Sequence, residues 1–95
     1  MDTRPLGRTG LSVTAISLGT MTWGQQNTEE EAFAQMDHAL EAGLKLFDTA
    51  ELYPIPRRAE TQGRTEEYIG NWLQARPGAR DRIILASKVV GRPDA

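Results

Sequence analysis

Leu44-Lys45-Leu46-Phe47-Asp48-Thr49-Ala50-Glu51-Leu52-Tyr53 is the stretch of this 95-residue chain that decides its fold. It begins as a mostly apolar run, short enough for a buried strand. The run ends in the carboxylate of Asp48, and Tyr53 follows shortly after. Ligands bind at the carboxyl ends of strands in parallel α/β sheets, so we expect Asp48 to lie at a ligand-binding edge.

A second apolar run, Ile83-Ile84-Leu85-Ala86-Ser87, ends at Lys88. The distance in sequence between Asp48 and Lys88 accommodates one strand-helix-strand unit, which needs roughly 30 residues or more. Such a unit brings two parallel strands side by side with their ends aligned. We therefore expect an acid, a phenol and an amine to meet at one edge of a sheet: Asp48, Tyr53 and Lys88.

The composition excludes several classes of protein. The net charge is −2 with both signs interspersed, whereas nucleic-acid and anionic-membrane partners require concentrated Lys and Arg. There is no cysteine for a disulfide and only one histidine, His38, which argues against a zinc site. The chain lacks an N-terminal apolar signal segment and any run of about 20 apolar residues, so we expect a cytoplasmic protein.

The order of the elements predicts the α/β class. Residues 3–13 read as a hairpin because Gly7-Arg8-Thr9-Gly10 has the composition of a turn. We then expect strands at residues 13–18, 44–48 and 82–87, separated by two helices. Alternating strands and helices are typical of a parallel sheet with helical crossovers. The three strands end on Gly19-Thr20, Asp48 and Lys88, so polar and permissive residues gather at one end of this sheet.

Both predicted helices carry start and stop signals. Thr28 with Glu31 is a capping-box pattern, and Gly43 can end the first helix in a left-handed conformation. The second helix is expected at about residues 64–76. Gly70 within it lowers helix stability, which we interpret as a sign of close packing against a neighbouring element.

Two loops have compositions that suggest a role beyond connection. The first loop is Gly19-Thr20-Met21-Thr22-Trp23-Gly24. It is either shaped for a ligand or an ordinary turn with Trp23 folded onto the core. The second loop, residues 54–63, contains two prolines and is long for a compact domain. Its Arg57 and Arg58 either attract an anionic ligand or are exposed solubility charges, and we favour exposure.

Asp48, Tyr53 and Lys88 together have the chemistry of a proton donor. A free tyrosine has a pKa near 10, and a neighbouring ammonium lowers that pKa by stabilising the phenolate. A carboxylate beside the lysine keeps it charged and in place. A carbonyl under reduction needs such a donor as hydride reaches its carbon. The alternative is a structural Asp-Lys ion pair across two strand ends with a packed tyrosine.

These segments resemble the aldo-keto reductases. Asp48-Thr-Ala-Glu-Leu-Tyr53 is preceded by Gly19-Thr20-Met21 and followed by Ser87-Lys88, in the order and spacing typical of that family. The resemblance covers essentially the whole chain and extends to three further segments: Leu6-Gly-Arg-Thr-Gly-Leu11, Glu41-Ala-Gly-Leu44 and Thr65-Glu-Glu-Tyr-Ile-Gly70. The Pro54–Gln62 segment is similar to that of a bacterial, Tas-like branch.

The resemblance implies a fold and an activity. Residues 1–95 would be the N-terminal part of a (β/α)8 TIM barrel, with the hairpin closing the barrel floor and about three of the eight parallel strands present. The family reduces aldehydes and ketones to alcohols with NADPH and needs no metal. Some members instead serve as channel-associated subunits, so a non-catalytic cofactor-binding scaffold is the alternative.

The resemblance also assigns roles to individual residues. Tyr53 matches the general acid, Lys88 the residue that lowers its pKa, and Asp48 the partner of that lysine. The cofactor-lining positions are matched by Gly19, Thr20, Met21 and Asp48. Trp23 matches a position at the mouth of the substrate pocket.

The chain lacks parts that the family requires. The family's fourth catalytic residue is a histidine at the end of the fourth strand, which lies beyond Ala95, and His38 is on the wrong element to replace it. Eight strands need about 250 residues, so we expect these 95 residues to be inactive alone. An incomplete barrel also leaves open sheet edges, which favour self-association. A free-standing three-stranded protein of unrelated function is the remaining alternative.

Overall fold

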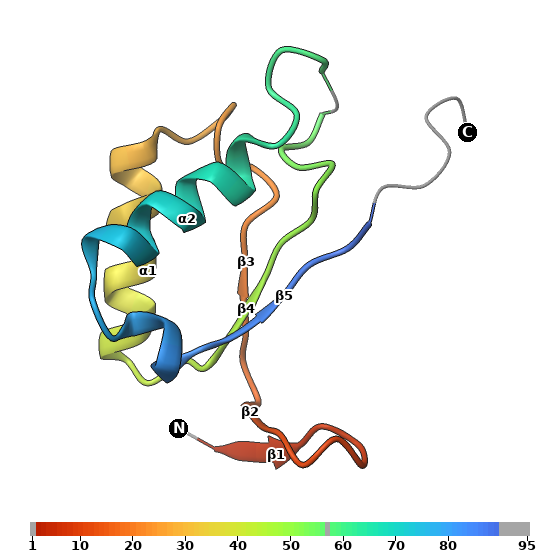
Figure 1. Ribbon diagram of the computed structural model, residues 1–95, viewed down its shortest axis with the longest axis vertical. Helices are drawn as coiled ribbons and strands as arrows, with labels where there is room; N and C mark the ends of the chain where they lie inside the picture. The colour runs from red at the N-terminus through yellow and green to blue at the C-terminus, as the bar shows by residue number, and fades with distance from the viewer. Residues whose placement is uncertain (1, 57, 90–95) are drawn as a thin grey trace.

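The structure is a computed structural model that describes residues 2–56 and 58–89. Figure 1 shows a small hairpin below a parallel sheet, with the helices to one side of the strands. The hairpin consists of β1 (Thr3–Pro5) and β2 (Ser12–Thr14), and the sheet of β3 (Leu18–Gly19), β4 (Leu46–Asp48) and β5 (Ile84–Ala86). The helices are α1 (Glu29–Glu41), α2 (Arg64–Ala75) and a short 3-10 helix, η1 (Ala79–Arg82).

The sheet is parallel, as the alternation of elements predicts. Its strand order is β3-β4-β5, and Gly19 pairs with Asp48, which in turn pairs with Ala86. The carboxyl ends of the three strands are therefore level with one another. The hairpin predicted at residues 3–13 is also present, with β1 antiparallel to β2.

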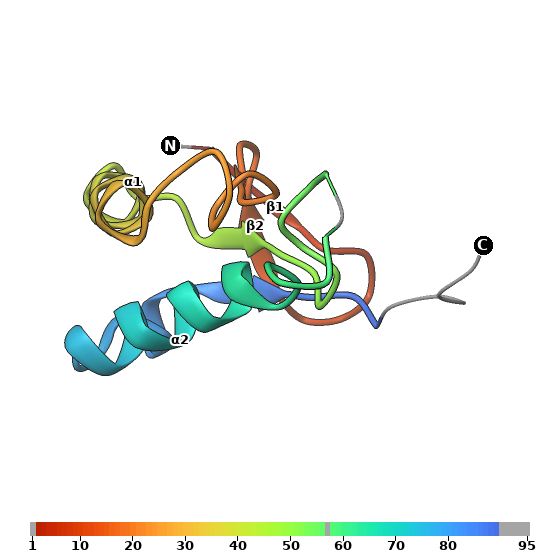
Figure 2. The same ribbon diagram turned by 90° about the horizontal axis from the view of Figure 1, so that it is seen from above.

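One face of the sheet is covered by α1 and α2, which lie side by side in Figures 1 and 2. The core between them consists of large side chains that are almost completely buried: Trp23, Met36, Phe47, Ile69 and Trp72. The rings of Phe47 and Trp72 pack with their centroids 5.8 Å apart. Burying each such side chain stabilises the fold by about 1.5–3 kcal/mol, so this core fixes the helices on the sheet.

The first helix begins and ends where the sequence predicts. The Thr28 hydroxyl accepts a hydrogen bond from Glu31 N at 3.2 Å, and the Glu31 carboxylate accepts one from Thr28 N at 2.8 Å. This reciprocal capping box satisfies two amides that have no partner within the helix. At the other end Gly43 adopts a φ of +88°, the left-handed conformation that favours glycine.

Two predictions about local structure are wrong. Residues 13–18 do not form one strand, because the chain bends at Ala15 and Ile16 to pass from the hairpin into the sheet. The bend is held by hydrogen bonds from Ala15 N to Asp2 O and from the Thr14 hydroxyl to Ile16 O. Gly70 does not pack closely, since it is exposed and a Cβ there would meet no heavy atom within 4 Å.

Beyond these corrections, the second helix agrees closely with its predicted range of 64–76, and residues 84–86 of the predicted strand 82–87 form β5. The 3-10 helix before β5 was not predicted. None of the helices in residues 2–56 and 58–89 has the length and apolar character needed to cross a membrane.

A polar cluster ties α1 to α2 beside the apolar core. Both Asp37 carboxylate oxygens accept hydrogen bonds from Arg76, at 3.0 Å from Nε and 2.8 Å from the terminal nitrogen, and Trp72 Nε1 donates to Asp37 at 2.8 Å. The Arg76 hydrogen bonds, and after them that of Trp72, lower the pKa of Asp37 below its ordinary value of 3.8. The ionised form of Asp37 is therefore favoured by folding.

We predict that Asp37→Asn destabilises the protein in a pH-dependent way. A lowered carboxyl pKa in the folded state stabilises the fold above the unfolded pKa, and this contribution is lost as the pH falls through the folded pKa. Urea unfolding should therefore show wild type more stable than Asp37→Asn at neutral pH, and the difference should shrink below pH 3.8. Glu41→Gln, an exposed change on the same helix, is the control. A difference in unfolding free energy between wild type and Asp37→Asn that stays constant with pH would contradict the lowered pKa of Asp37.

Candidate active site

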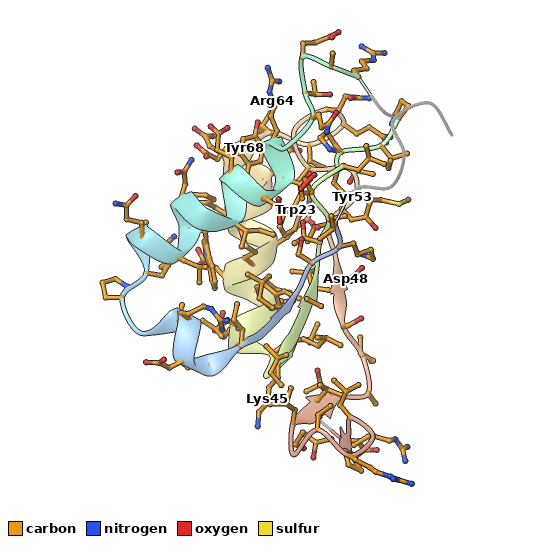
Figure 3. The ribbon with its side chains drawn as sticks, turned by 45° about the vertical axis from the view of Figure 1, so that its right-hand side comes forward. Trp23, Lys45, Asp48, Tyr53, Arg64 and Tyr68 are labelled. Carbon is orange, nitrogen blue, oxygen red and sulfur yellow. The ribbon has the colours of Figure 1, made fainter. Side chains whose placement is uncertain are left out.

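The three residues that sequence reasoning places at one edge come from adjacent strands. Asp48 is the last residue of β4, Tyr53 lies in the loop that follows it, and Lys88 lies just beyond the end of β5. Side chains alternate between the two faces of a strand. Because Asp48 pairs with Ala86, Lys88 shares a face with Asp48, opposite the face on which Phe47 is buried. Figure 3 shows Asp48 and Tyr53 near one another at this end of the sheet.

The Lys88 ammonium is the centre of this arrangement. Its Nζ lies 3.0 Å from each Asp48 carboxylate oxygen and 2.9 Å from the main-chain oxygen of Thr49. It also lies 3.4 Å from the Tyr53 hydroxyl oxygen and 5.0 Å from the centroid of the tyrosine ring. An acid and a phenol thus both contact one amine, although Asp48 and Lys88 are far apart in sequence.

The surroundings keep Lys88 positively charged. Its hydrogen bond to Asp48 is the largest cause that raises the pKa of the ammonium above its ordinary value of 10.5. Desolvation by burial, the second-largest cause, opposes this rise in the pKa, and the hydrogen bond to Tyr53 adds to it. At neutral pH a full positive charge therefore faces the Tyr53 oxygen.

Main-chain hydrogen bonds hold the loop that carries Tyr53. Tyr53 N donates to Ala50 O at 3.2 Å, and Tyr53 O accepts from Gly63 N at 3.0 Å. The loop is tied to β5 by a bond from Glu51 N to Lys88 O at 3.1 Å, and to the loop after β3 by one from Ile55 N to Met21 O at 2.7 Å. The backbone of Tyr53 is consequently held at both its amide and its carbonyl.

The residues expected to line a cofactor divide into two groups. Gly19 is exposed at the end of β3, with no heavy atom within 4 Å of where a Cβ would lie, and Met21 is 52% exposed. Gly19 is also the β3 residue that pairs with Asp48. Thr20 differs, because it is 1% exposed and its hydroxyl donates to Asp48 O at 2.9 Å. The Thr20 hydroxyl is therefore engaged with the Asp48 main chain, and the place of Thr20 in a cofactor-lining loop stays a prediction.

Trp23 lies in the loop that follows β3, and its side chain is packed in the core. Its side chain is 1% exposed within the core, and its Nε1 donates to Gln35 on α1 at 2.9 Å. Thr65 on α2 donates to Trp23 O at 2.6 Å, so the residue is held from both helices. This geometry agrees with the alternative of a turn with Trp23 on the core, and a place for Trp23 at the substrate mouth stays a prediction.

Other candidates lie away from this edge. His38 is exposed in the last turn of α1, and Arg58 is exposed, while Arg57 lies outside the described residues. Residues 2–56 and 58–89 contain no cluster of three metal-ligating side chains. A hollow of about 520 Å³ lies at the opposite end of the sheet, near Leu11, Lys45 and Ile84, and contains none of the predicted site residues.

Sequence reasoning missed two contacts of the site. The Thr49 main-chain oxygen is one of the Lys88 acceptors, and a backbone acceptor leaves no signal in residue type. The Ser87 hydroxyl donates to the Glu66 carboxylate at 2.6 Å, which links the segment before Lys88 to the first turn of α2. An acidic residue at a helix start is common for other reasons, so this link was not evident either.

Comparison with known proteins gives a consistent result. The model of the aldo/keto reductase family matches residues 15–95. Protein Tas of Escherichia coli K12 is 50% identical over 91 residues, which are 96% of this chain and 26% of Tas. An 11.2 kDa protein of Pseudescherichia vulneris is 37% identical over 89 residues, 94% of this chain and 86% of that protein.

Solved structures agree. The aldo-keto reductase AKR11C1 from Bacillus halodurans, in its holo form, superposes with a TM-score of 0.77 and 38% identity, over 97% of this chain and 27% of that one. The chain therefore belongs to the aldo/keto reductase family and forms the N-terminal portion of its barrel. It spans about a quarter of the length of Tas. Family membership removes the alternative of an unrelated three-stranded protein.

We predict that the Asp48–Lys88 ion pair contributes little to stability. The two side chains are 39% and 53% exposed, and exposed ion pairs contribute about 0–1 kcal/mol. Lys88→Met should therefore lower the free energy of unfolding by less than about 1 kcal/mol in urea titrations. Lys45→Met changes the only other lysine of the chain and is the control.

A large loss of stability confined to Lys88→Met would contradict this prediction. It would favour the alternative in which Asp48 and Lys88 form a structural ion pair. A small loss would mean that stability does not account for the arrangement of these side chains.

Proposed function

We propose that the whole protein containing this chain is an NADPH-dependent reductase that converts aldehydes and ketones to alcohols, with Tyr53 as its general acid. One observation carries the proposal: the Lys88 ammonium contacts both the Asp48 carboxylate and the Tyr53 hydroxyl at the open end of the sheet. Family membership supports oxidoreductase activity in general.

In this proposal each residue has one role. NADPH, when bound, supplies hydride to the carbonyl carbon. The Tyr53 hydroxyl donates a hydrogen bond to the carbonyl oxygen and transfers its proton as negative charge develops there. The Lys88 ammonium, 3.4 Å from the tyrosine oxygen, stabilises the phenolate that remains. Asp48 holds that ammonium in position through both carboxylate oxygens.

The residues that would hold the nicotinamide end of the cofactor are Gly19, Met21 and Asp48. The open space beside Gly19 and the exposure of Met21 support this assignment. Aldo-keto reductases typically use a nicotinamide cofactor, and a related structure is described as a holo form. The preference for NADPH is carried over from the family, because the segments that bind the adenosine phosphate are not in this chain.

We also propose that residues 1–95 form a partial barrel domain that does not turn over NADPH alone. The chain covers 26% of Tas, and β3 and β5 each have a neighbour on one side only within the described sheet. Unpaired strand edges bind further strands. We propose that the whole protein acts on a small carbonyl substrate and is located in the cytoplasm. For the short chain alone, we propose self-association through the edges of β3 and β5.

Exchange of tyrosine for phenylalanine tests the proposal. Tyr53→Phe removes the proton donor and keeps the ring, so kcat for aldehyde reduction by the whole protein should fall about 100-fold or more. Tyr68→Phe makes the same change at the only other tyrosine of the chain, on α2, and should leave kcat unchanged. The measurement is NADPH absorbance during turnover.

Unchanged turnover in Tyr53→Phe would contradict the assignment of the general acid. Binding of NADPH by wild type without any reduction would instead favour a non-catalytic scaffold. Turnover of NADPH by the isolated 95-residue chain would overturn the proposal that this portion is inactive alone.

A further inference from the structure

Asp48 must itself be held in place if it is to position Lys88. The backbone ladder between β3 and β4 ends at the pair of Gly19 and Asp48. The main-chain oxygen of Asp48 accepts a hydrogen bond from the Thr20 hydroxyl at 2.9 Å. A side chain thus binds the Asp48 carbonyl just beyond the end of the ladder.

This bond fixes one side of a peptide plane whose other side is fixed by β5. The carbonyl of Asp48 and the amide of Thr49 belong to one planar unit. Thr49 N donates to Ala86 O at 2.8 Å, while Asp48 O accepts from Thr20. The two bonds hold the plane from the β5 side and from the β3 side. The two residues that share this plane supply the Asp48 carboxylate and the Thr49 main-chain oxygen that bind Lys88.

Thr20 is in turn fixed by the core. Its carbonyl accepts from Trp23 N at 3.1 Å, which closes a turn whose Trp23 side chain is 1% exposed between the helices. Thr20 is itself 1% exposed, so its hydroxyl does not exchange its partner for water. A connected series of contacts therefore runs from the buried tryptophan to the Lys88 ammonium.

We propose that Thr20 is a positioning residue, which orients Asp48 and thereby Lys88, and that its side chain does not bind the cofactor. The kinetic part of this proposal rests on the proposed reductase function. The structural part concerns Asp48 and Lys88 alone and holds whether or not the protein is catalytic.

Three variants test the role of Thr20. Thr20→Val keeps the shape and removes the hydroxyl, and Thr20→Ser keeps the hydroxyl. Thr14→Val is the control, because Thr14 is also buried and its hydroxyl also bonds main-chain atoms, Ile16 O and Lys45 N, at the opposite end of the sheet. Thr20→Val and Thr14→Val thus each remove one buried hydroxyl, and they differ only in which end of the sheet the hydroxyl occupies.

The first readout needs no turnover. The hydrogen exchange of lysine ammonium protons is measured by NMR on 15N-labelled lysine, with the Lys88 signal assigned by its loss in Lys88→Arg. In wild type the Lys88 protons should exchange more slowly than those of Lys45, because Lys88 has four oxygen contacts. Thr20→Val should abolish this difference, and Thr20→Ser and Thr14→Val should preserve it. Slow exchange retained in Thr20→Val would overturn the proposal.

The second readout uses the whole protein with NADPH and an aldehyde. Thr20→Val should lower kcat by about tenfold, the range of a lost hydrogen bond, and leave the dissociation constant of NADPH unchanged. Weaker NADPH binding with unchanged kcat would return Thr20 to the cofactor-lining residues and overturn the proposal. If wild type reduces no aldehyde, the reductase function fails, and ammonium exchange still decides the role of Thr20.

Discussion

The contact of the Lys88 ammonium with the Asp48 carboxylate is the interaction on which the site depends, and it exists only because β4 and β5 pair in one register. Asp48 lies opposite Ala86, so Lys88, two positions further along, shares its face of the sheet. A slip of one residue would turn Lys88 toward the helices and leave Asp48 without its cation. The helices α1 and α2 fix that register by burying Phe47 on the opposite face.

Stability and function are therefore supplied by different parts of the molecule. The apolar core around Phe47 and Trp72 holds the sheet together, with the Asp37–Arg76 contacts at its side. The Asp48–Lys88 pair is half exposed, and we expect it to add little to the free energy of unfolding. A small contribution would agree with the proposed role of this pair in chemistry at the open end of the sheet.

The sequence predicted the parallel sheet, the capped first helix and the meeting of Asp48, Tyr53 and Lys88, because periodicity and strand ends depend on local patterns. It did not predict the bend at Ala15 and Ile16, where the chain leaves one sheet for another, and it left the burial of Trp23 as one of two alternatives. Both depend on packing between distant segments. The Thr20 hydrogen bond to the Asp48 carbonyl was missed as well, because its acceptor is a main-chain oxygen and leaves no signal in residue type.

The central claim is that this edge of the sheet supports carbonyl reduction in the whole protein. The most direct test is to supply an aldehyde with NADPH that carries deuterium at the transferable position of the nicotinamide ring, and to analyse the alcohol by mass spectrometry. The account predicts one deuterium on the carbon that was the carbonyl carbon. Bound NADPH with no labelled alcohol, across a panel of aldehydes and ketones, would contradict it and would identify a scaffold that retains the geometry of the site without its reaction.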